Sequence, residues 1–61
     1  MEYEDVKNFI GKRVSLTISN GYYFKGLVTN VSETTLSLID IREHDVALAL
    51  INIIRIEEVE K

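Results

Sequence analysis

The sequence contains no cysteine, no proline and no tryptophan, and it has a single histidine, His44. Without cysteine the chain cannot form a disulfide bond, and one histidine cannot build a histidine-rich metal centre. Long hydrophobic runs are also missing, since the longest, Val46 to Ile51, is far too short to span a membrane. We therefore expect no metal, no cofactor and no membrane association.

The residues that catalysis needs are equally scarce. No serine, histidine and aspartate are grouped as a nucleophile and its base would be, and no glycine-rich loop is present to hold a phosphate. Three acids stand alone near expected turns, where a solvated charge is the ordinary interpretation: Glu33, Asp40 and Asp45. The sequence therefore predicts a protein that is not an enzyme.

Basic residues are outnumbered, and the net charge of −3 counts against attraction of phosphates by the chain as a whole. The acids gather at the two ends of the chain: Glu2, Glu4 and Asp5, and then Glu57, Glu58 and Glu60. Between them, residues 6–56 hold six lysines and arginines against four acids, which leaves room for a locally basic patch. The acidic start also replaces the basic segment that opens a signal peptide, and we expect a cytoplasmic protein.

A chain of 61 residues makes one small domain. Domains of this size bury only about 60% of the surface that the unfolded chain exposes, so their hydrophobic core is marginal. Disulfides, a metal or oligomerisation are the usual remedies. The composition excludes the first two, and we therefore expect a homo-oligomer.

Residues 3–10 have the pattern of a short amphipathic helix, with apolar residues on roughly one face: Tyr3, Val6, Phe9 and Ile10. Acids fill its first turn, where the helix dipole favours anions. Gly11 follows at the position where the end of a helix favours glycine. We expect this helix to cover one open end of a barrel.

From Val14 onward the apolar period changes to two, which is typical of half-buried strands. The pattern predicts five strands, at about residues 13–19, 22–31, 35–41, 45–51 and 54–59. Asn20-Gly21 predicts a type I′ turn between the first two strands, because both residues tolerate positive φ. Gly26 predicts a bulge or a sharp bend in the long second strand.

Three adjacent aromatic residues follow the turn, and their expected roles differ. In the register set by the turn, Tyr22 and Phe24 share the face that leads on to Val28, so both are predicted core residues. Tyr23 points to the other face, where it is free to contact solvent, a neighbouring subunit, a ligand or a cross-strand partner. The aromatic cluster is therefore better explained as part of the barrel than as a platform for stacking bases.

A short helix followed by five short antiparallel strands predicts an all-β domain over residues 1–61. The expected architecture is a small, strongly bent antiparallel barrel of the SH3-like type, because a bent second strand lets so short a sheet close on itself.

The sequence resembles the Sm/LSm family, which includes the bacterial RNA chaperone Hfq. The family's first motif is matched by FIGKRVSLTISNGYYFKGLV, its third strand by ETTLSLID and its second motif by VALALINIIRIEEV. Gly11, Asn20, Gly21 and Gly26 fall in place without gaps. Other SH3-like barrels share parts of this pattern, among them the C-terminal domain of the bacterial ribosome maturation factor RimP.

The resemblance implies an Sm-like, Hfq-like ring of about five to eight subunits, in which the fourth strand of one subunit pairs with the fifth strand of the next. The residue pattern agrees, because a strand at 46–51 with two apolar faces is a liability unless something covers it. We therefore expect the following residues at the subunit interface: Val46, Leu48, Leu50, Ile54 and Ile56.

The RNA pocket of the family is the part from which this sequence departs. The family places an aspartate, a stacking residue and an asparagine in the first motif, where this chain has Ser32, Thr34 or Thr35, and Leu36. An Arg-Gly or Lys-His pair of the second motif is replaced within residues 50–52. Threonine has no π-face for a base, and leucine cannot bind a base edge.

The remaining candidates for RNA binding are Thr34, Thr35, Asn52 and Arg55 near the pore of the expected ring, and Lys25 and Tyr23 on its outer surface. One hypothesis is thus a non-catalytic ring that binds single-stranded RNA through altered contacts. The alternative is a protein-interaction or scaffold oligomer, or an SH3-like adaptor, that binds no RNA. The acidic termini and the altered pocket motivate this alternative.

Overall fold

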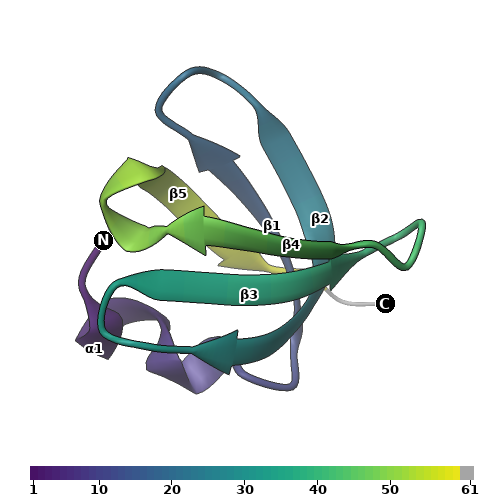
Figure 1. Ribbon diagram of the computed structural model, residues 1–61, viewed down its shortest axis with the longest axis horizontal. Helices are drawn as coiled ribbons and strands as arrows, with labels where there is room; N and C mark the ends of the chain where they lie inside the picture. Colours follow the sequence, from purple (N-terminus) through teal and green to yellow (C-terminus); the bar gives the residue numbers. More distant parts are fainter. Residues whose placement is uncertain (60–61) are drawn as a thin grey trace.

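The computed structural model describes residues 1–59, which form one antiparallel sheet and a short N-terminal helix (Figure 1). Helix α1 spans Tyr3–Val6 and continues as a 3₁₀ turn, η1, over Lys7–Phe9. The strands are β1 (Arg13–Ile18), β2 (Tyr23–Val31), β3 (Thr35–Asp40), β4 (Asp45–Ala49) and, after a second 3₁₀ turn η2 (Leu50–Asn52), β5 (Ile53–Glu58). This arrangement confirms the predicted fold class of a small all-β domain with one short helix. Glu60, one of the C-terminal acids, lies outside the described residues.

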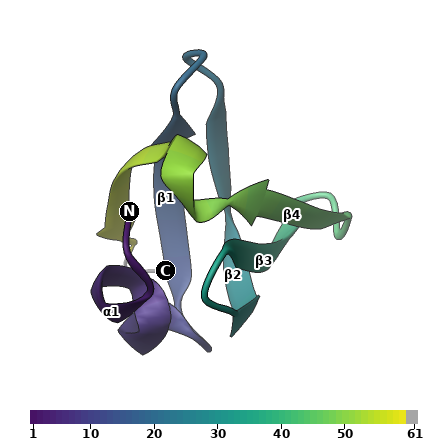
Figure 2. The ribbon, with the colours of Figure 1, turned by 60° about the vertical axis from the view of Figure 1, so that its left-hand side comes forward.

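The strands are ordered β4-β3-β2-β1-β5, and each neighbouring pair is antiparallel. The long β2 curves strongly, so that β3 and β4 lie across β1 and β5 (Figures 1 and 2). Within residues 1–59, β4 and β5 pair with β3 and β1 but not with each other. The barrel-like sheet therefore keeps two unpaired strand edges. No helix in the same residues is long and apolar enough to cross a bilayer.

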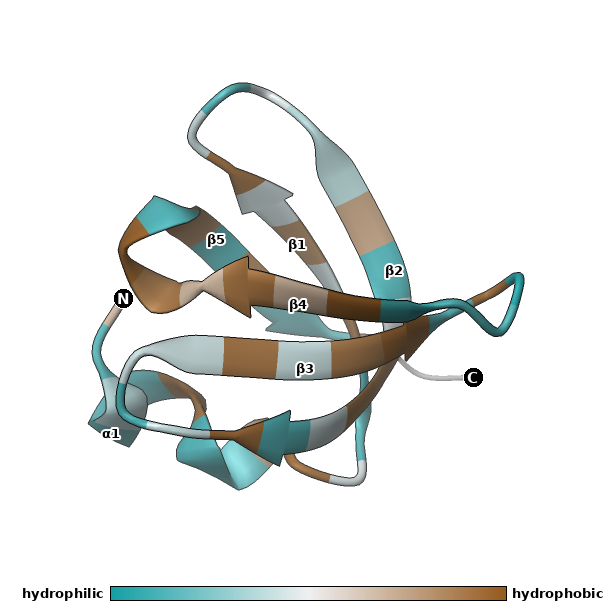
Figure 3. Ribbon diagram, viewed as in Figure 1, coloured by the Kyte–Doolittle hydropathy of each residue, from teal (hydrophilic) through white to brown (hydrophobic). Residues whose placement is uncertain are grey.

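Apolar and polar residues alternate along the strands, as Figure 3 shows most clearly for β3, whereas β4 is apolar on both faces after Asp45. The apolar set points into the space between the two halves of the bent sheet and forms the core: Val6, Val14, Leu16, Val28, Val31, Leu36, Leu38, Leu50 and Ile53. Val6 brings α1 into this core, and Tyr3 and Phe9 pack against it. The helix therefore packs against the core of the sheet, as expected for a helix that covers one end of a barrel.

The helix is short because the residues that favour its first turn are followed, only a few positions later, by a glycine that ends it. The backbone N–H of Glu2 donates to the carboxylate of Asp5 at 3.3 Å, as in one half of a capping box. Glu4 forms an ion pair of 2.6 Å with Lys7, and this contact raises the pKa of the Lys7 ammonium. Gly11, with φ of +84°, then turns the chain toward β1, as predicted for the residue after a helix.

The turn between β1 and β2 differs from the predicted type I′ turn. Ile18 closes a loop of residues 19–21, because its N–H donates to the carbonyl of Tyr22 and its carbonyl accepts from Gly21, both at 2.9 Å. Within residues 1–59, only Glu43 among the non-glycine residues has positive φ, so Asn20 does not adopt the type I′ conformation, whereas Gly21 does have positive φ. Tyr22 directly precedes the first residue of β2 and is 64% exposed, so the prediction that it is a core residue was wrong.

The bulge that was predicted in β2 exists, but it lies at Thr29 instead of Gly26. Val28 pairs with Leu38, whereas Asn30 pairs with the next residue of β3, so Thr29 is the extra residue of a bulge. This bulge explains why the buried residues Val28 and Val31 are three positions apart. Pairing across Gly26 is regular on both sides.

Candidate functional site

The six residues predicted to bind RNA lie in two separate places. One group lies on the outer face of the sheet: Tyr23, Lys25 and Arg55. The other group lies around η2: Thr34, Thr35 and Asn52. The resemblance predicts Arg55 in the second group, but the sheet brings it to the first, because Thr17 is the cross-strand partner of both Tyr23 and Arg55.

The outer-face group combines an exposed aromatic ring with two cations. Tyr23 is 62% exposed and shares its face of β2 with Lys25, two residues on. Arg55 lies on the far side of Thr17, and its guanidinium binds the carboxylate of Glu57 at 2.6 Å and 3.1 Å. A ring with a free π-face beside cations is chemically suited to a nucleic acid base and its phosphates.

The hydroxyl groups of Thr34 and Thr35 are occupied within their own turn. Their side-chain oxygens lie 3.3 Å apart, and both backbone N–H groups donate to the hydroxyl of Ser32, at 3.4 Å and 3.1 Å. The carbonyl of Thr34 accepts from Leu50 at 2.8 Å, which ties the β2–β3 turn to η2. These contacts shape the turn and leave Thr34 little freedom to bind a ligand.

The surroundings of Thr34 are acidic. A shallow hollow beside it, between α1 and the β2–β3 turn, is lined by Glu2, Tyr3, Glu4 and Glu33. Three carboxylates in this position repel the phosphates of a nucleic acid. The position at which the resemblance predicts an RNA pocket is therefore unfavourable for phosphates.

The unpaired edges of β4 and β5 expose backbone N–H and C=O groups that could bind another strand. The pattern of side chains in the sequence does not reveal them. Just outside the two ends of β4, the N–H of Leu50 donates to the carbonyl of Thr34, and the carbonyl of His44 accepts from the N–H of Asp40. Both Leu50 and His44 therefore direct their backbone groups toward β3. The alternation of an antiparallel ladder then directs the N–H groups of Val46 and Leu48 toward β3 and that of Ala47 toward the free edge. By the same alternation, counted from the hydrogen bond between Val59 and Arg13, Ile56 and Glu58 face the free edge of β5.

The five side chains predicted at a subunit interface are placed unequally. Leu50 is only 1% exposed and belongs to the core of the single chain. Val46, Leu48 and Ile56 point inward and are half-buried against that core. Ile54 is well exposed. Sequence reasoning thus found the edge strands, whereas the groups available for pairing are mainly their backbones.

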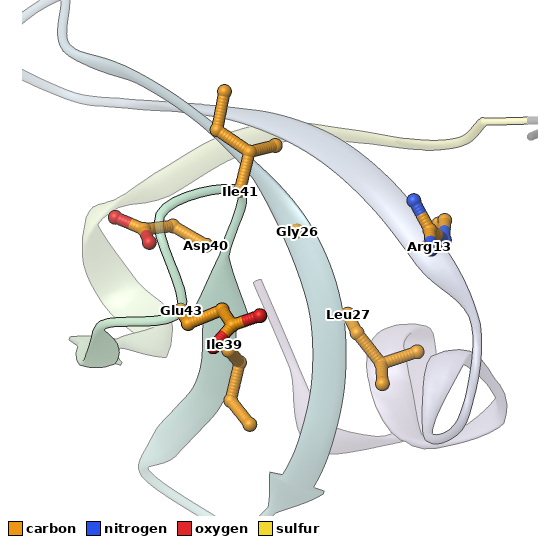
Figure 4. A pocket seen from close by; sticks show the side chains of 7 residues that line it. All are labelled: Arg13, Gly26, Leu27, Ile39, Asp40, Ile41 and Glu43. Carbon is orange, nitrogen blue, oxygen red and sulfur yellow. The ribbon is translucent and has the colours of Figure 1, made fainter.

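A second hollow, of about 320 Å³, lies on the outer face of the sheet (Figure 4). Gly26, Leu27 and Ile39 lie along it, with Ile41 beside them. Arg13 stands on the β1 side, and Asp40 and Glu43 stand on the side of the β3–β4 loop. Sequence reasoning did not identify this surface, because Leu27 and Ile39 follow the ordinary alternation of a strand and carry no motif.

The loop after β3 is organised by Asp40. Its Oδ1 accepts hydrogen bonds from the backbone N–H groups of Arg42 and His44, both at 2.9 Å. The bond from His44 is the main cause that lowers the pKa of the Asp40 carboxyl below its usual value. The acid predicted to be a merely solvated charge therefore has a structural role.

Residues 1–59 contain no group of histidine, cysteine, aspartate and glutamate that could hold a metal ion. Comparison of the chain with protein-family models, with curated proteins and with solved structures found no match.

Proposed function

We propose that this chain is a non-catalytic Sm-like module that assembles into a homo-oligomeric ring and binds single-stranded RNA on the outer face of its sheet. The proposal of an oligomeric ring is supported by the two unpaired strand edges, at β4 and at β5. The proposal of RNA binding is supported by the exposed aromatic side chain of Tyr23, which has Lys25 and Arg55 on the same face.

The argument for a ring starts from the two edges. An unpaired edge exposes N–H and C=O groups that another strand can bind, and natural proteins usually protect such edges. Pairing β4 of one copy with β5 of another uses two different surfaces, and a contact of this kind closes into a ring when its rotation permits. The added burial also compensates for the small core of nine buried apolar residues.

The argument for RNA on the outer face rests on what the two candidate surfaces offer. The hollow beside Thr34 is lined by carboxylates, which repel phosphates. The outer face offers Tyr23 for stacking, and stacking contributes about 1–3 kcal/mol per base without strong sequence preference. Lys25 and Arg55 outnumber Glu57 there, so the local charge is positive although the chain is acidic as a whole.

The ring is tested by Ala47→Pro and by native mass spectrometry. Proline removes the N–H that faces the free edge of β4, and it is tolerated in edge strands because no bond of the single chain is lost. We expect the wild type at a mass of more than two 7.0 kDa chains and the variant, which cannot form the ring, at a mass of one or two folded chains. Ala47→Val, which keeps the N–H, is the matched control and should assemble. A wild type that stays monomeric would instead favour an SH3-like adaptor.

The RNA contact is tested with labelled uridine-rich and adenine-rich oligonucleotides. Tyr23→Ala should weaken binding about tenfold, whereas Tyr23→Phe should not, because stacking needs the ring and not its hydroxyl. Tyr22→Ala is the matched control, since Tyr22 is equally exposed but lies outside the sheet. Lys25→Gln should reduce the dependence of affinity on salt. Absence of binding by the wild type, or equal losses in both tyrosine variants, would favour the alternative of a protein-interaction scaffold.

A further inference from the structure

A second surface lies on the outer face of the sheet, further along β2 than Tyr23 and Lys25. Four residues form a continuous row across four strands there, because Arg13 pairs with Leu27, Leu27 with Ile39, and Ile39 with Asp45. We call these residues the charged row. It begins with a cation on β1, continues through two apolar side chains and ends with an anion on β4.

The charged row is open to solvent although its centre is apolar. Leu27 is exposed, and its neighbour Ile39 is half-buried; Ile41, which follows β3 and lines the same hollow, is 75% exposed (Figure 4). Neither Arg13 nor Asp45 belongs to an ion pair among residues 1–59. Contiguous exposed apolar side chains flanked by charges are typical of protein-interaction surfaces.

The order of charges in the row makes it complementary to itself. A two-fold axis that runs parallel to the strands, between β2 and β3, reverses the row while the two outer faces meet. Leu27 then faces Ile39 of the second copy, and Arg13 faces Asp45 of the second copy at each end. An axis perpendicular to the strands would bring Arg13 against Arg13, so the charges favour one orientation only.

We propose that two copies of this chain pack face to face through the charged row, about the axis that runs along the strands. The apolar centre supplies the burial, because exposed ion pairs contribute little by themselves. The charges set the orientation of the two copies. This contact uses the face of the sheet, whereas the proposed ring uses its edges, so pairing through the row joins single chains into dimers and joins rings into larger assemblies.

The test reverses one charge at a time and measures mass by native mass spectrometry at low salt. Arg13→Glu alone places two acids together at both ends of the row, and Asp45→Lys alone places two cations together. Each variant should therefore show a lower mass than the wild type, and in single chains the mass of a monomer in place of a dimer. An equal mixture of the two should recover the full mass, because every contact then joins opposite charges. The double variant Arg13→Glu/Asp45→Lys should recover it as well.

Repeating the series in the Ala47→Pro background separates this proposal from the ring. If the edges form the ring, this background starts from single chains, and pairing through the row then gives a dimer. Circular dichroism checks that each variant is folded, and Glu33→Lys, a charge reversal on the β2–β3 turn away from the row, should not change the mass. A wild type with the same mass as Arg13→Glu, or a mixture that fails to recover the higher mass of the wild type, would overturn the proposal.

Discussion

The backbone carbonyl oxygen of Ile39 lies against Gly26, inside the space that a Cβ atom at that position would occupy. The Cα of Asp40 would lie 2.8 Å from a Cβ atom placed on residue 26. Two consecutive residues of β3 therefore occupy the space beside Gly26 that a side chain would need. Strands β2 and β3 approach each other closely because residue 26 has no side chain.

Gly26→Ala should destabilise the fold by at least about 2–3 kcal/mol, because backbone atoms and not a flexible side chain must move. Gly21→Ala is the matched comparison, since a Cβ there meets open space and only the φ of +89° is unfavourable. Its cost should be about 1–2 kcal/mol. Urea denaturation of both variants measures the difference, and equal losses would show that β3 can yield.

Glu43 is the only non-glycine residue of residues 1–59 with positive φ, at 66°. Glu43→Gly should raise the free energy of unfolding by about 0.5–1 kcal/mol, because glycine adopts this conformation without strain. Glu43→Val should lower it, since a β-branched side chain fits the left-handed region poorly. Thermal unfolding of the three proteins should rank them in the order glycine, glutamate, valine.

Leu50 and Ile51 are adjacent apolar residues with opposite environments, at 1% and 86% exposure. Leu50→Ala should cost about 2–5 kcal/mol through lost burial and a cavity in the core. Ile51→Ala should change stability by less than about 0.5 kcal/mol, as expected for an exposed position. Chemical denaturation in an Ala47→Pro/Arg13→Glu background, which prevents both proposed contacts, measures the single chain. A large loss for Ile51→Ala there would contradict its exposed position.

Acid should weaken the β3–β4 loop through Asp40. Because its pKa in the folded protein is lowered from the usual 3.8, the ionised carboxylate stabilises the fold at neutral pH. This contribution is present above the unfolded pKa and is lost as pH falls through the lower folded value. The stability advantage of the wild type over Asp40→Asn should therefore shrink below about pH 4.

Melting temperatures from pH 7 to pH 2 provide the measurement. Glu33→Gln is the control, because the Glu33 side chain lies away from the charged row and accepts no hydrogen bond within residues 1–59. An Asp40→Asn difference that stays constant across this range would show that the carboxylate charge does not stabilise the loop.

The positions of the strands could be predicted because alternation of side chains decides which residues are buried. Every predicted strand end agrees with the structure within two residues. The turn type could not be predicted in the same way, since Asn20-Gly21 is compatible with a two-residue or a three-residue loop. The hydrogen bonds of Ile18, which depend on the whole ladder, decide between them.

The candidate site was less predictable because it depends on how the sheet is wrapped. Tyr23 was correctly separated from Phe24 by the period of two, since it is exposed on the outer face and Phe24 packs against the core. The pairing of Thr17 with both Tyr23 and Arg55 brings together residues that are far apart in the sequence, and no local pattern encodes it. The backbone edge at Ala47 was hidden for a different reason, because N–H groups have no side-chain signature.

Thr29 is the extra residue of the bulge in β2, and we expect the curvature of this strand to depend on it. Without it, Val28 and Val31 would become two positions apart, so the strand would keep an apolar face and a polar face but lose its bulge. A deletion of Thr29 should therefore yield a chain that still forms strands by circular dichroism yet exposes its core to a hydrophobic dye. Native-like dye exclusion by this variant would show that the bend has another origin. Exposure of the core to the dye would show that the sheet lies flatter although its hydrophobic pattern has become more regular, so that the wrapping of this barrel-like sheet depends on one residue that breaks the pattern.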